Sequence, residues 1–98
     1  MQIIAWRRLV DFWTTHPRAE TSLRAWFQAA HAARWQGPAD VRRDFGSADF
    51  IADHRVIFNI AGNRYRLVAH IDYLYKRVLV KFVGTHADYD RIDPETVK

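Results

Sequence analysis

Residues 55–71 read RVIFNIAGNRYRLVAHI, and this stretch decides the fold because two apolar runs flank a turn signal. Apolar side chains recur at every second position in both runs, as in β-strands, whose successive side chains point to opposite faces. Gly62-Asn63 lies between the runs and favours a tight hairpin turn. That turn predicts three cross-strand pairs with their apolar members on one face: Ile60 with Tyr65, Phe58 with Leu67, and Val56 with Ala69.

A third strand is predicted from the sequence VLVKFV at residues 78–83. If the preceding turn lies at Leu74-Tyr75, the antiparallel register gives these pairs: Ile71 with Val78, Ala69 with Val80, and Leu67 with Phe82. Phe82 then lies on the core face, and Lys81 lies on the opposite face, diagonal to Arg66. Gly84 ends the alternation, so we expect a short exposed segment to follow at the edge of the sheet.

The first half of the chain has a helical period instead. Apolar residues recur every three or four positions over Trp6–Thr15 and again between Pro17 and Gly37, which predicts two amphipathic helices. A short third helix is predicted for Pro38–Asp44, since proline suits the first turn of a helix, and a loop is predicted for Phe45–Asp53. Four aromatic side chains are predicted to be core residues rather than stacking surfaces for bases: Trp13, Trp26, Phe27 and Trp35.

The two ends of the chain complete the predicted fold. Met1–Ala5 suggests either a short first strand or a lead into the first helix, and Arg91–Lys98 suggests a polar tail that is only partly ordered. Helices followed by antiparallel strands predict an α+β fold, in which a small antiparallel β-sheet packs against N-terminal helices. We expect residues 1–98 to form a single domain.

Composition narrows the functional classes. The chain has a net charge of +4 and a pI near 9.9, mostly from arginine, which favours a phosphate-bearing or acidic partner, although a basic surface also aids solubility. Cysteine is absent, which excludes disulfides, thiol catalysis and cysteine-zinc sites. No apolar run approaches the length of a membrane span, so we expect a soluble cytoplasmic protein that makes no membrane contact.

Basic side chains on the predicted strands lie near two proton-transferring groups that follow the last strand. Arginine can hold the non-bridging oxygens of a phosphodiester and stabilise transition-state charge, while histidine or tyrosine transfers protons. We therefore predict a catalytic set that comprises Arg64, Arg66, Lys81, His86 and Tyr89. The predicted RNA-binding residues are Asn59, Arg64, Arg66, Lys76, Arg77 and Lys81.

Each candidate also has a purely structural interpretation. Exposed Arg64 and Arg66 need no function, and Tyr89 could anchor the C-terminal segment. Asp88 and Asp90 are assigned supporting roles, such as capping a turn. The remaining histidines lack the spacing of metal ligands, so the sequence predicts neither a metal site nor a cofactor.

Two motifs together resemble the HigB toxins of bacterial HigB–HigA toxin–antitoxin pairs: FNIAGNRYRLV at residues 58–68 and GTHADYD at residues 84–90. The resemblance extends over nearly the whole chain. It implies a RelE-like toxin fold and an mRNA interferase that cleaves messenger RNA, usually on the ribosome, without a metal and through attack of the RNA 2′-hydroxyl. It also implies that basic residues of the central strands act with a histidine or tyrosine after the last strand, which matches the predicted catalytic set.

The same resemblance implies the partners. The HigA antitoxin, a helix-turn-helix protein, would neutralise the toxin, and operator DNA would be bound only through the toxin–antitoxin complex. The mRNA and the ribosome would be the targets. A different class of function is a noncatalytic basic module that binds RNA or protein through the same face, which predicts salt-sensitive RNA binding without new 5′-hydroxyl ends.

Overall fold

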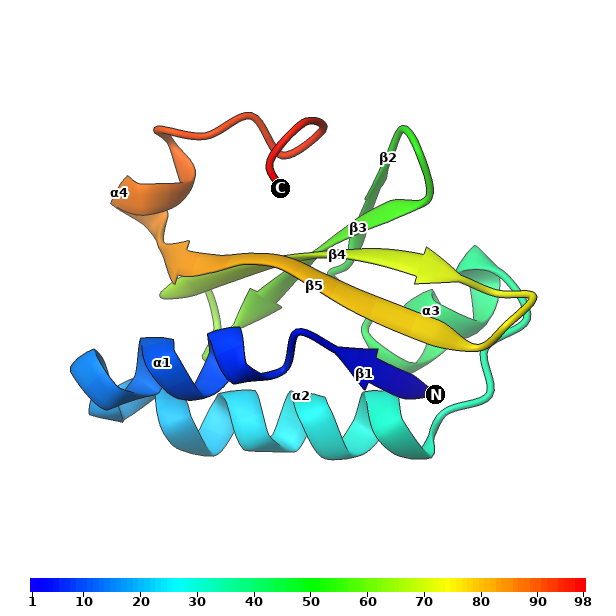
Figure 1. Cartoon of the computed structure of the whole chain (residues 1–98), viewed down its shortest axis with the longest axis horizontal. Coiled ribbons are helices and arrows are strands. Elements are labelled where there is room, and N and C mark those ends of the chain that lie inside the picture. Colours follow the sequence, from blue (N-terminus) through cyan, green and yellow to red (C-terminus); the bar gives the residue numbers. More distant parts are fainter.

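The computed structural model describes residues 1–98 as a five-stranded sheet with helices on both of its faces (Figure 1). In chain order the elements are β1 (Gln2–Ile4), α1 (Arg7–Thr15), a single 3-10 turn (Pro17–Ala19), α2 (Glu20–Ala32), α3 (Pro38–Asp44), β2 (Asp49–Ile51), β3 (Arg55–Ile60), β4 (Tyr65–Asp72), β5 (Arg77–Thr85) and α4 (His86–Tyr89). Helices α1 and α2 cover one face, and α4 with the C-terminal tail lies over the other. None of the helices combines the length and the apolar character needed to cross a bilayer.

The strand order is β1-β5-β4-β3-β2, which confirms the α+β class. The expectation of an antiparallel sheet is wrong for one strand, because β1 pairs in parallel with β5. Parallel neighbours need a long crossover, and here the helices and three other strands provide it. The expected loop at Phe45–Asp53 is wrong in part, since it contains β2, whose three residues are too few for a periodic signal.

The β3–β4 hairpin has the predicted register. The pairs observed are Ile60 with Tyr65, Phe58 with Leu67, and Val56 with Ala69. The connection, however, comprises the four residues Ala61–Arg64, and its first two have positive φ values of 54° at Ala61 and 68° at Gly62. Because Ile60 still faces Tyr65, the longer turn leaves every side chain on its predicted face.

The β4–β5 ladder departs from prediction at a β-bulge. The pairs Ile71 with Val78 and Ala69 with Val80 are as expected, but the register then shifts, and Leu67 pairs with Val83 rather than Phe82. One extra residue, Lys81, is therefore accommodated on β5, and it reverses the alternation beyond that point. Val83 packs against the core and Phe82 leaves it. The sequence could not reveal this shift, because both residues are apolar.

The core lies between the sheet and the α1–α2 layer. Its largest fully buried side chains are Trp26, Trp35, Phe58, Leu9, Leu23, Leu67, Ile71, Val41, Val56, Val78 and Val80. The Trp26 ring packs edge-on against the Phe58 ring, with 5.4 Å between ring centroids, and the Trp35 ring stacks on the Phe58 ring at 6.4 Å. Burying one such side chain contributes about 1.5–3 kcal/mol. Trp26 and Trp35 are core residues as predicted, whereas Trp13 and Phe27 lie at the margin of the core and are half-buried.

The C-terminal tail docks against the sheet instead of remaining partly ordered. Arg55, only 7% exposed, donates Nη1 hydrogen bonds to the carbonyls of Pro94, at 3.0 Å, and Val97, at 2.6 Å. Arg8 of α1 donates to the carbonyl of Lys98 at 3.1 Å. Hydrogen bonds from a charged donor are among the stronger ones in proteins, so these arginines hold the tail in place.

Candidate active site

Helix α4 carries His86 and Tyr89 and follows β5 without a loop. Four residues are too few for a helix that is stable alone, but a capping box fixes its start. The Thr85 Oγ1 accepts a hydrogen bond from the Asp88 backbone N–H at 3.1 Å, and the Asp88 Oδ2 accepts one from the Thr85 N–H at 3.1 Å. The supporting role predicted for Asp88 is therefore confirmed as a helix cap.

Gly84 allows α4 to pack closely on β5. A Cβ at this position would lie 2.6 Å from the Phe82 Cζ and 2.9 Å from the Asp88 Cβ, both closer than real contacts permit. The strand does not end at Gly84 as predicted but continues to Thr85. Nor is β5 an edge strand, since it lies between β1 and β4, although β1 pairs only with its first three residues.

Arg66 of β4 lies directly opposite Gly84 in the ladder, so its side chain extends toward α4. Its Nη2 is 3.5 Å from the Nε2 of His86, a long contact in which the guanidinium can only donate. Its guanidinium carbon is 5.1 Å from the ring centroid of Tyr89, within the range of a cation–π interaction. The other neighbour of Tyr89 is Phe82, at 6.4 Å between ring centroids. The structure thus brings together three of the five predicted catalytic residues.

The positive charge of Arg66 has no acidic partner. The ion pairs of the chain involve only Arg24 and Arg43 among the arginines. Arg66 is half-buried, and its Nε has no hydrogen-bond partner. An arginine that is partly desolvated and unpaired is suited to bind an anion, because an incoming phosphate would supply the missing acceptors.

Asn59 lies opposite Arg66 on the other neighbouring strand, β3. Its Nδ2 donates to the Ser47 carbonyl at 3.3 Å, while its buried Oδ1 has no partner. The orphaned Asn59 Oδ1, an acceptor, and the orphaned Arg66 Nε, a donor, thus belong to cross-strand neighbours.

Arg64 and Lys81 stand apart from this cluster. Arg64 lies in the turn before β4 rather than on a strand, it is exposed, and its side chain makes no hydrogen bond or ion pair. Lys81 is half-buried at the β-bulge and likewise has no such partner. Both side chains therefore remain cations without a hydrogen-bond or ion-pair partner near the strands of the site.

Lys76 and Arg77 lie at the opposite end of the β4–β5 hairpin. In the ladder Arg77 lies opposite Asp72, which is six residues along β4 from Arg66. Six residues of an antiparallel strand span about 20 Å. The Lys76 Nζ donates to the Trp35 carbonyl at 2.9 Å and thus has a structural partner. These two predicted RNA-binding residues cannot contact the same nucleotide as Arg66.

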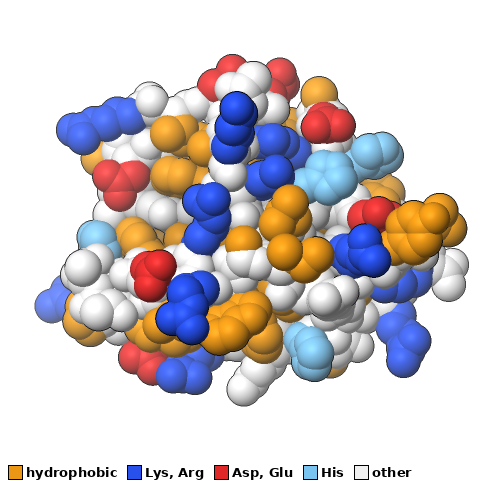
Figure 2. Space-filling model, viewed as in Figure 1, with side chains coloured by type: hydrophobic (Ala, Val, Ile, Leu, Met, Phe, Trp, Pro, Cys, Tyr) orange, Lys and Arg blue, Asp and Glu red, His pale blue; other side chains and the backbone are white.

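The charges on the surface are mixed. Figure 2 shows Lys and Arg side chains distributed over one face with acidic side chains between them, and no unbroken basic patch. Arg66 is distinguished by its environment, because it is half-buried and its Nε has no hydrogen-bond partner. Burial does raise the pKa of one tyrosine, Tyr73, but that residue follows Asp72 at the far end of β4, away from α4.

Sequence reasoning missed the residues that hold the cluster together. Gly84 was interpreted only as the end of a strand, and Thr85 and Phe82 received no role in the site. The pattern T-x-x-D at Thr85–Asp88 is a variant of the capping box and could have revealed the start of α4. The close approach at Gly84 depends on the β-bulge, for which the sequence carries no signal.

The cluster can perform acid–base chemistry beside a bound anion. Arg66 supplies fixed positive charge, and the imidazole of His86 and the phenol of Tyr89 each carry a transferable proton next to it. A half-buried site strengthens such electrostatic interactions relative to those in water. This combination suits the transfer of a phosphoryl group between oxygen atoms.

Comparisons with known proteins point to one family. Residues 19–92 match the HigB toxin family, described as the RelE-like toxic component of a toxin-antitoxin system. The mRNA interferase toxin HigB of Escherichia coli strain K12 is 27% identical over 92 residues, covering 92% of this chain and 88% of that protein. The mRNA interferase HigB of Escherichia coli O6:H1 is 24% identical over 79 residues, covering 79% and 77% respectively.

Proposed function

The chain belongs to the HigB family of RelE-like toxins, and from this premise we propose that it is an endoribonuclease that cleaves messenger RNA. The observation that carries the proposal is the convergence of Arg66, His86 and Tyr89 at one end of β4 and β5. The relatives named mRNA interferase align over most of this chain, which supports the same chemical class.

In the proposed reaction the RNA supplies its own nucleophile. The ribose 2′-oxygen forms a bond to phosphorus, and the bond between phosphorus and the 5′-oxygen of the next nucleotide breaks. The proton of the 2′-hydroxyl passes to a base, and the departing 5′-oxygen receives a proton from an acid. His86 and Tyr89 supply these two roles. The products are a 2′,3′-cyclic phosphate, which can open to a 3′-phosphate, and a 5′-hydroxyl end.

Arg66 would stabilise the charge that develops on the phosphorus oxygens. It has no carboxylate to neutralise it, and its planar fork can donate two parallel hydrogen bonds to a phosphate. Losing one such preorganised donor typically slows a reaction about 100- to 1,000-fold. Arg64 and Lys81, which lie outside the cluster, are proposed to contact the backbone of the RNA further from the scissile bond.

The finer features of the proposal concern the target and the partner. We propose that cleavage occurs on ribosome-bound mRNA in the cytoplasm, that residues 1–98 form one toxin domain, and that a HigA antitoxin neutralises the toxin. Operator DNA would be bound through the complex and not by the toxin alone. Family membership as the toxic component of a two-protein system supports the existence of an antitoxin.

The experiment adds the purified chain to a translation extract and maps new RNA ends. We expect 5′-hydroxyl ends in mRNA when ribosomes are present, and little cleavage of free RNA. The variant His86→Ala should lose activity, and Tyr89→Phe should separate loss of the phenol from loss of the ring that stacks on Arg66.

Two results would contradict the proposal in different ways. Wild-type cleavage by both His86→Ala and Arg66→Ala would show that the site is elsewhere. Salt-sensitive binding of RNA without any new 5′-hydroxyl ends would instead support a noncatalytic RNA-binding module. Circular dichroism of each variant controls for loss of the fold.

A further inference from the structure

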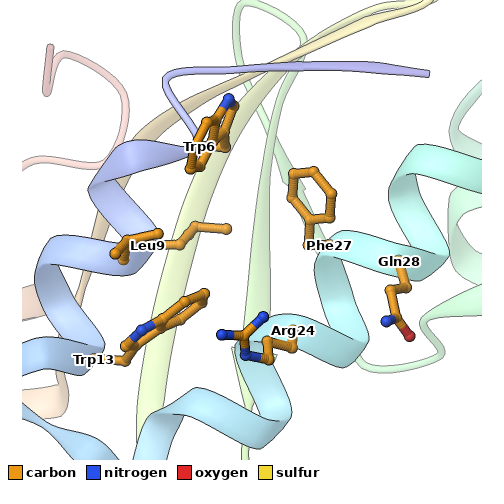
Figure 3. A pocket seen from close by; sticks show the side chains of 7 residues that line it. Trp6, Leu9, Trp13, Arg24, Phe27 and Gln28 are labelled. Carbon is orange, nitrogen blue, oxygen red and sulfur yellow. The ribbon is translucent and has the colours of Figure 1, made fainter.

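A groove of about 500 Å³ lies between α1 and α2 and has no role in the proposed chemistry. Five of its seven lining residues are hydrophobic. Figure 3 shows side chains that line the groove, with Arg24 extending toward Trp13. Trp6, Leu9 and Trp13 come from α1 and the residue before it, and Arg24, Phe27 and Gln28 come from α2. A volume of this size accommodates a few large side chains of another molecule.

Trp6 is the unusual member of the groove. It begins the predicted first helix, Trp6–Thr15, yet it is the N-cap residue of α1 and is 46% exposed. The preceding residue, Ala5, has a φ of 61°, a left-handed conformation that costs a non-glycine residue about 1–3 kcal/mol. The chain therefore turns sharply between β1 and α1, and the turn presents a large apolar ring at the rim of the groove.

The charged groups at the groove are arginines. The Arg24 guanidinium lies 4.7 Å from the Trp13 ring centroid, and the Arg7 guanidinium lies 5.6 Å from that of Trp6. Glu20 engages the Nε of Arg24 at 2.7 Å, but the two Nη groups have no partner, and Arg7 has no acidic partner. Because no acidic residue lines the groove, it is complementary to apolar side chains flanked by carboxylates.

The groove and the candidate active site lie on opposite faces of the sheet. Helices α1 and α2 cover one face, and α4 lies over the other (Figure 1). A molecule seated between α1 and α2 would therefore leave Arg66, His86 and Tyr89 accessible. RNA is the less suitable occupant, because Leu9 and Val10 form apolar walls and Arg24 is the only lining residue able to neutralise a phosphate.

We propose that this groove docks an apolar, acid-flanked segment of the antitoxin, with Trp6 and Trp13 as the aromatic anchors on the toxin. Tryptophan and arginine dominate the binding energy of many protein interfaces, and both occur here around one concave, apolar surface. The inference rests on the proposed function to the extent that the chain is one partner of a toxin–antitoxin pair. It adds the place of docking, away from the reacting groups.

The test compares Trp6→Ala with Tyr75→Ala as a matched control. Tyr75 is also an exposed aromatic residue, 66% accessible, with an arginine 5.5 Å from its ring centroid, but it lies at the tip of the β4–β5 hairpin. Binding to the purified full-length antitoxin of the pair is measured by calorimetry. We expect Trp6→Ala to weaken binding at least about tenfold and Tyr75→Ala to change it less than about twofold.

A charge variant and an activity assay complete the design. Arg7→Glu should weaken antitoxin binding and reduce its salt dependence, while mRNA cleavage by Trp6→Ala without antitoxin should equal that of the wild type. The proposal would be overturned if Trp6→Ala and Arg7→Glu both bound the antitoxin with wild-type affinity. It would also be overturned if both variants lost RNA binding while their binding to the antitoxin stayed unchanged. A wild-type chain that binds the antitoxin through Trp6 but cleaves no RNA would refute only the proposed function.

Discussion

The two ends of the β4–β5 hairpin each carry an arginine beside a tyrosine ring, yet only one end forms a candidate active site. Arg66 lies 5.1 Å from the centroid of Tyr89, and Arg77 lies 5.5 Å from that of Tyr75. The residue types and the distances are nearly the same. The difference between the two ends must therefore arise from what surrounds each pair.

At the Arg66 end, Gly84 lets α4 approach the strand and place His86 beside the guanidinium. At the other end, Tyr75 is two-thirds exposed, and a carboxylate lies opposite Arg77. That carboxylate, of Asp72, instead caps the turn by accepting hydrogen bonds from the backbone N–H groups of Leu74 and Tyr75 at 3.1 and 3.0 Å. Partial burial and a fixed neighbour distinguish a reactive arginine from a solvated one.

The largest expected effect comes from removing each arginine in turn. Arg66→Ala should slow mRNA cleavage about 100-fold or more, because the transition-state charge loses its preorganised donor. Arg77→Ala should remain within about threefold of the wild type, since its guanidinium is screened by solvent. The initial rate at which new 5′-hydroxyl ends form measures the activity of both variants. Equal losses of activity in the two variants would show that the two ends of the hairpin do not differ in function.

The second prediction concerns the close packing at Gly84. Gly84→Ala should destabilise the protein by about 1–3 kcal/mol, as overpacking does, and should reduce cleavage by displacing α4 from Arg66. Gly46→Ala is the matched control, because nothing lies within 4 Å of a Cβ at that position. Urea unfolding gives the stability and the cleavage rate gives the function. If the two variants behave alike, the approach of α4 does not depend on this glycine.

The third prediction tests the capping box. Asp88→Ala and Thr85→Ala should each cost about 0.5–2 kcal/mol of stability and reduce cleavage, because both remove a hydrogen bond that fixes the start of α4. Thr85→Ser keeps the hydroxyl and should retain most of the activity. A loss of cleavage in Asp88→Ala that Asp88→Asn fails to restore would indicate a chemical role for the carboxylate beyond capping.

The smallest expected effect is a pH dependence at the hairpin-tip end. Burial raises the pKa of Tyr73 above its ordinary value of 10.0. A group whose pKa is higher in the folded state contributes stability that is complete below the pKa of the unfolded chain and is lost as pH rises through the folded pKa. Stability should therefore fall above pH 10, and Tyr73→Phe should flatten that loss. Urea midpoints at pH 8 and above pH 10 measure it, and identical slopes for both proteins would exclude Tyr73 as the cause.

Much of the scaffold was predictable from local pattern. The alternation on either side of Gly62 determined the β3–β4 register even though the turn has four residues, because only this parity buries the apolar faces. The bounds predicted for the third helix, Pro38–Asp44, are those observed for α3. Phe82 shows the limit, since one extra residue in β5 moved it from the predicted core face to the neighbourhood of Tyr89.

The sequence by itself determined the α+β class, the hairpin register, and the residue types available near the end of β5. Only the tertiary structure decided that Arg66 meets His86 and Tyr89, that Arg64 and Lys81 stand apart, and that a groove opens beside Trp6. The physical reason is that alternation and capping are local properties of neighbouring residues. The effects of the β-bulge in β5, of the missing Cβ at Gly84 and of the unpaired Arg66 guanidinium instead depend on the residues that the fold brings into contact with them.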